Sequence, residues 1–138
     1  MGMYTELILG CRLREDTPDY VIEALDHVIN HITEDDRTIS QEAEEFIETY
    51  DIPRIFWSSS FYFGVCHSHR IFEYNETTRC YVLDVRSSSK SGLKIDKFLN
   101  ALVKYIEAGS GLHNIYAYVH YEEDIMPTIY SLEPIENN

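Results

Sequence analysis

Strict alternation of apolar and polar residues predicts two strands. Four apolar side chains share one face of residues 4–13: Leu7, Leu9, Cys11 and Leu13. They do so because successive side chains of an extended chain point to opposite sides. Residues 115–121 alternate in the same way, which places Tyr116, Tyr118 and His120 together on one face.

Apolar spacings of three and four residues predict three helices. The first runs from a Thr17-Pro18-Asp19 start to Ile32, and the others lie within residues 39–50 and 93–108. Proline is well accommodated in a first helical turn, and an apolar stripe of this width is typical of a helix that packs on a core. Ile52-Pro53 is expected to end the second helix.

The middle of the chain favours further strands. Residues 54–65 are rich in aromatic and β-branched side chains, which predicts a strand. Residues 70–74 and 79–85 flank a short turn and predict a hairpin. Residues 87–92 are expected to form a loop, and residues 128–132 a short last strand.

The predicted element order is β-α-α-β-β-β-α-β-β, which belongs to the α+β class. We expect a mostly antiparallel sheet with two or three helices packed on one face. A ferredoxin-like variant is compatible with two β-α units that enclose hairpins. The 138 residues fit one domain, with a frayed tail at about residues 133–138.

Charge narrows the range of functions. The chain has 24 Asp and Glu against 11 Lys and Arg, a formal net charge of −13. Such a surface repels phosphates, so direct nucleic-acid binding is not expected. Three cysteines, no apolar run near the roughly 20 residues that span a bilayer, and no recognisable secretory signal predict a cytoplasmic protein with no membrane partner.

The acidic residues concentrate between residues 34 and 48, where Arg37 is the one Lys or Arg. A run of this kind usually forms a solvated face that maintains solubility. The alternative is an electronegative surface for a basic partner, since complementary charge speeds encounter. The candidate partner-binding residues are Glu34, Asp35, Asp36, Glu42, Glu44, Glu45 and Glu48.

A serine-rich segment before the last predicted helix suggests a second type of site. Hydroxyls, backbone N–H groups and a helix N-terminus can together hold a phosphate. The plainer interpretation is a connector loop with scattered lysines. The candidate anion-binding residues are Arg86, Ser88, Ser89, Lys90, Ser91 and Lys94.

Cys66, His67 and His69 are the nearest approach to a reactive or metal-binding group. A structural zinc site uses four protein ligands, and no second cluster stands at a suitable spacing. Cys66 and His67 would point to opposite faces of a strand, which suits a nucleophile and its base poorly. We expect no metal, no cofactor and no catalytic residue, and whether these three side chains have a chemical role stays open.

Tyrosine is abundant, and Tyr116, Tyr118 and His120 are expected to face solvent or a partner. Tyrosine is a frequent interface anchor, because it is large, rigid and able to form hydrogen bonds. A homodimer is therefore left open.

The opening Met1-Gly2-Met3-Tyr4-Thr5-Glu6-Leu7, followed by Asp16-Thr17-Pro18, resembles small uncharacterised proteins encoded by phages and prophages. The resemblance carries no catalytic motif. It implies an accessory protein that binds and blocks a host factor, such as a defence system. The acidity fits inhibitors that mimic nucleic acid.

The expected function is that of a non-enzymatic acidic binding protein in the host cytoplasm. It would engage a basic host protein that handles nucleic acid. The alternative is a module that binds a phosphorylated small molecule or nucleotide in the segment from Ser87 to Lys94.

Overall fold

The computed structural model describes residues 4–34, 36–58, 68–90, 94–108 and 114–132. Its strands are β1 (Tyr4–Arg12), β2 (His69–Asn75), β3 (Cys80–Lys90), β4 (Ile115–Tyr121) and β5 (Thr128–Ser131). Its helices are α1 (Asp19–Asn30), α2 (Gln41–Tyr50), α3 (Ile52–Phe56) and α4 (Ile95–Leu102), and a 3-10 turn (Val103–Tyr105) follows α4.

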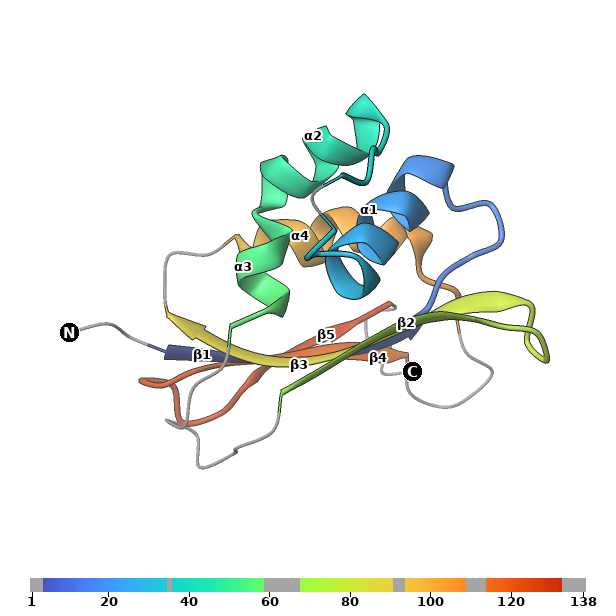
Figure 1. Cartoon of the computed structure of the whole chain (residues 1–138). Coiled ribbons are helices and arrows are strands. Elements are labelled where there is room, and N and C mark those ends of the chain that lie inside the picture. Colours follow the sequence, from blue (N-terminus) through green and yellow to red (C-terminus); the bar gives the residue numbers. More distant parts are fainter. Residues whose placement is uncertain (1–3, 35, 59–67, 91–93, 109–113, 133–138) are drawn as a thin grey trace.

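The five strands form one antiparallel sheet in the order β2-β3-β1-β4-β5. Figure 1 shows the helices gathered on one face of this sheet. The predicted α+β class is confirmed, and the described residues form four α-helices where two or three were expected. The first four strands and the helices between them follow the split β-α-β order of ferredoxin-like folds, and β5 extends the sheet beside β4.

The core lies between the sheet and the helices. Leu7 and Leu9 of β1 are fully buried, as are Leu25 of α1 and Phe98 of α4. The alternation predicted for the N-terminal strand is therefore correct, and it fixes which sheet face the helices cover. We call the opposite side of the sheet the outer face.

The strand predicted over residues 54–65 is wrong in its described part, which forms helix α3. Asp51 adopts a left-handed conformation, with φ 54° and ψ 45°, and so ends α2. Pro53 then starts a new helical turn, where its missing N–H costs nothing. Ile52, Ile55 and Phe56 are buried at helical spacing. Residues 59–65 lie outside the described ranges.

The serine-rich segment also differs from its prediction. Residues 87–90, expected to belong to a loop, continue β3 and pair with Tyr4–Leu7 of β1 in antiparallel register. The Ser87 hydroxyl donates to the Ile55 carbonyl at 2.7 Å, and Ser87 is 2% exposed. Serine is tolerated in this strand because β1 pairs with its backbone groups and the Ile55 carbonyl of α3 accepts the Ser87 hydroxyl.

The last predicted helix is shorter than residues 93–108. It ends at Leu102, passes through the 3-10 turn, and becomes extended at Ile106. Ile106 forms an isolated bridge with Leu13, and the Glu107 N–H donates to the Arg12 carbonyl at 2.8 Å. The position of Ile106 continues the apolar spacing of the helix, but its pairing with the end of β1 makes it extended instead.

A substitution of Leu99 tests which face of α4 packs in the core between the helices and the sheet. This side chain is fully buried in α4, so Leu99→Ala should lower the free energy of unfolding by about 2–5 kcal/mol in a urea melt. Lys97→Ala, on the exposed side of the same helix, is the control and should change it by less than about 0.5 kcal/mol. Equal effects of the two substitutions would show that α4 packs through another face.

Candidate functional site

The four glutamates of α2 form the first candidate site. Glu42, Glu44, Glu45 and Glu48 are exposed, whereas Ala43 and Phe46 of the same helix are buried. Ser40 caps the helix by accepting from the Ala43 N–H at 3.2 Å. Figure 1 shows α2 on the outside of the helical layer, away from the sheet. The predicted acidic face therefore projects from a helix whose other side is fixed in the core.

The helix dipole explains part of this acidity. Glu42 and Glu44 lie in the first turn, where negative charge stabilises a helix. Glu48 lies near the C-terminus, where the same charge is unfavourable. Within the described part of the chain, none of the four carboxylates forms an ion pair. Stability of α2 alone therefore does not account for Glu48.

The preceding acids are in a different electrostatic setting. Glu34 pairs with His31 at 2.9 Å, and Arg37 pairs with Asp26 of α1 at 3.2 Å. Asp36 is exposed, and Asp35 lies outside the described residues. Arg37 is thus engaged by a carboxylate of α1 and does not neutralise α2.

The candidate anion site is not assembled by the described residues. Ser88 and Ser89 are both buried, but neighbouring strand residues point to opposite sheet faces. Arg86 pairs with Glu6 at 3.1 Å, and the Lys94 ammonium group donates to the Thr49 carbonyl at the end of α2. Ser91 and the Lys90 side chain are not described. These groups do not converge on one phosphate.

Of the candidates Cys66, His67 and His69, only His69 is among the described residues. Cys66 and His67 lie outside the described residues, and His69 contacts Asp84 on the neighbouring strand at 2.9 Å. Among the described side chains, no group of three His, Cys, Asp or Glu is arranged to hold a metal ion. None of the described helices has the length and apolarity to cross a membrane.

The predicted tyrosine face is divided between the two sides of the sheet. Tyr118 is exposed, and His120 bonds to the Asp124 carbonyl at 2.8 Å. Tyr116 is 6% exposed and packs near Tyr130, because a register shift between Ile115 and Ala117 turns it inward. A bulge of this kind leaves little trace in a simple alternating pattern.

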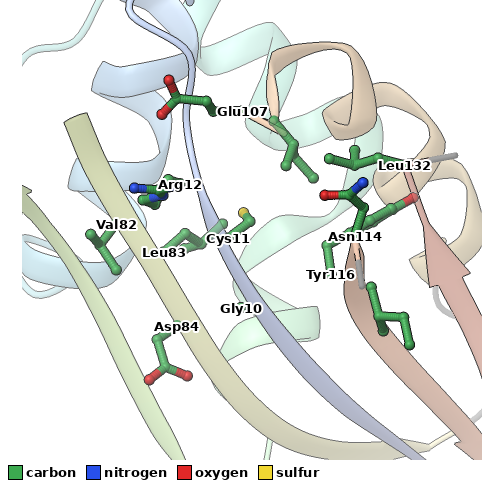
Figure 2. A pocket seen from close by; sticks show the side chains of 12 residues that line it. Gly10, Cys11, Arg12, Val82, Leu83, Asp84, Glu107, Asn114, Tyr116 and Leu132 are labelled. Atoms are coloured by element: carbon green, nitrogen blue, oxygen red, sulfur yellow. The ribbon is translucent and has the colours of Figure 1, made fainter. Parts of the chain in front are cut away.

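A cavity of about 390 Å³ opens where β1 and β4 separate. Pairing between these strands ends at Leu9 and Ala117, while β1 continues to Arg12. Figure 2 shows Gly10, Cys11 and Arg12 on one strand, with Asp84 on one side and Asn114 and Tyr116 on the other. Its volume is in the range of small-molecule sites.

A thiol and a guanidinium group are among the polar groups that line this cavity. Burial raises the pKa of the Cys11 thiol to about 12, so the thiolate nucleophile is scarce at neutral pH. Arg12 is half-buried, and its guanidinium has no hydrogen bond or ion pair with the described chain. The alternating pattern around Gly10 predicted the strand, but it gave no signal that β4 would separate from it here.

Comparison with known proteins gives no relative for this arrangement. No protein-family model matches the chain, and neither a curated protein nor a solved structure matches it.

The Cys11 thiol gives a pH-dependent prediction. Above pH 9 the unfolded thiol ionises, whereas the folded thiol stays protonated up to about pH 12. Stability is therefore fully present below pH 9 and falls above it, by up to about 1.4 kcal/mol per pH unit. Cys11→Ala removes this contribution, so urea melts of the variant should decline less steeply between pH 9 and 11. Parallel declines would mean that the thiol is solvated.

Proposed function

We propose that this chain is a non-enzymatic acidic binding protein whose α2 face engages a basic protein that handles nucleic acid. The observation that carries the proposal is the outward display of Glu42, Glu44, Glu45 and Glu48 from a helix anchored by Ala43 and Phe46. A rigidly held charge pattern favours docking, because little side-chain and backbone freedom is lost on binding.

The spacing of these charges supports a partner that normally binds nucleic acid. From Glu42 to Glu48 the helix rises by about 9 Å, so the four glutamates have a mean spacing of about 3 Å along the axis, with single steps of about 3, 1.5 and 4.5 Å. One DNA strand carries a phosphate about every 3.4 Å. A cationic groove that tracks a phosphate backbone would meet a similar linear charge density on α2.

The setting proposed for this interaction is the cytoplasm of a bacterial host, with the chain as a phage accessory or counter-defence factor. The N-terminal resemblance to phage-encoded proteins and the acidity of the chain support it. A phosphorylated ligand at Ser87–Lys94 is less favoured, because the described members of that set lie on different faces of β3 or engage other groups.

The test compares two variants with the same change in net charge. In the first, Glu42, Glu44, Glu45 and Glu48 become Gln. In the matched control, exposed acids elsewhere are changed instead: Glu73→Gln, Glu76→Gln, Glu123→Gln and Asp124→Asn. Immobilised wild-type protein first recovers the partner from a bacterial lysate, and association rates are then measured at low and physiological salt.

We expect the α2 variant to associate about tenfold more slowly at low salt, with a flatter salt dependence, because steering depends on local charge. The control should remain near the wild-type rate. Melting temperature should stay equal or rise in the α2 variant, since like-charge repulsion is relieved. Equal rates for both variants at low salt, or a partner without a basic surface, would contradict the proposal.

A further inference from the structure

The cavity between β1 and β4 has an empty position at Gly10, an exposed residue that lines it. Gly10 contributes no side chain there, and a Cβ atom placed on it would meet nothing within 4 Å. Its backbone lies beyond the last β1–β4 pair, so the floor of the cavity is strand backbone. Glycine weakens a strand interior and commonly marks a site that a ligand approaches closely.

Two opposite charges flank this empty position on the outer face. Gly10 pairs with Asp84 across β3, and Arg12 pairs with Val82. Arg12 and Asp84 are therefore diagonal neighbours, about 7–8 Å apart at the backbone in an antiparallel sheet. Both line the cavity, but Asp84 contacts His69 at 2.9 Å through one carboxylate oxygen and forms no ion pair with Arg12. Figure 2 shows them on the same side of the β1 strand with Gly10 between.

Apolar side chains also line the cavity, on the side that holds Asn114 and Tyr116. Ile115, Leu132 and Ile106 line it, from β4, the end of β5 and the segment that bridges Leu13. A ligand that satisfied the two charges would thus place its remaining atoms against branched aliphatic side chains. Burial of such a group favours binding, because apolar surface is removed from water.

A zwitterion fits this arrangement better than a simple anion. The chain has a net charge of −13, and Asp84 and Glu107 both line the cavity. A bare carboxylate would therefore meet repulsion beyond its contact with Arg12. An α-amino acid carries a carboxylate for the guanidinium and an ammonium group for Asp84 on adjacent atoms.

We propose that this cavity binds a free α-amino acid with a branched apolar side chain. The carboxylate lies on Arg12, the ammonium group on Asp84, and the side chain against Ile115 and Leu132. This site is separate from the α2 face, so it neither requires nor follows from the proposed protein partner.

The experiment titrates the full chain with L-leucine and follows binding by calorimetry and by backbone amide shifts in NMR. Two analogues serve as comparators: 4-methylpentanoate, which lacks the ammonium group, and 3-methylbutylamine, which lacks the carboxylate. We expect saturable binding of leucine, with shifts concentrated around Gly10, Arg12 and Asp84. Each analogue should bind at least about tenfold more weakly.

Three variants distinguish loss of the binding site from loss of the fold. Gly10→Val fills the empty position, suits a strand, and should abolish leucine binding without lowering the melting temperature. Arg12→Gln should weaken binding by at least about tenfold. Arg14→Gln, which removes an exposed arginine paired with Asp16, is the matched control and should bind as the wild type does.

Any of three results would overturn the proposal. The first is no leucine binding by the wild-type chain at millimolar concentration. The second is equal affinity for leucine and 4-methylpentanoate, which would assign the cavity to carboxylates. The third is unchanged leucine affinity in a folded Gly10→Val variant, which would place the binding elsewhere.

Discussion

The two-sided pairing of β1 is the interaction on which the rest of the structure depends. This strand pairs with β3 along its whole length and with β4 from Thr5 to Leu9. Its side-chain alternation sends Leu7 and Leu9 into the helical layer, where both are fully buried. A shift of one residue in either register would exchange these leucines with Glu6 and Ile8. The position of every helix follows from which face of β1 is apolar.

The cavity results from the same strand. β1 extends to Arg12, but β4 can follow it only to Ala117, because the bulge turns Tyr116 inward. The segment after α4 takes over as the partner at the far end, through Leu13 and Ile106. Between these two partners lies an interval in which Gly10 supplies no side chain. The hollow is thus set by the strand lengths and by one glycine.

The sequence predicted those parts of the fold in which local pattern and tertiary packing agree. The alternation of residues 4–13, the strand at residues 115–121, the turn between β2 and β3, and the stripe that includes Phe98 and Leu99 all appear in the structure. Prediction failed where a distant partner decided the outcome. Ser87 lies in a strand because β1 and α3 bond to its backbone and hydroxyl groups. Ile106 is extended rather than helical because it pairs with Leu13. The acidic face of α2 could be found by spacing alone, whereas the cavity required the strand pairing.

The distribution of charge follows from this division into layers. Eleven acids and two bases lie between Asp19 and Phe56, a stretch that contains α1, α2 and α3. The outer sheet face instead brings Arg86 against Glu6 and His69 against Asp84. Repulsion among the helical acids is tolerated because buried side chains such as Phe46 and Leu25 hold the helices on the sheet. That anchoring keeps the carboxylates of α2 close together in solution, whereas an isolated segment of this charge would extend to separate them. The core therefore maintains the charge density that a basic partner would meet.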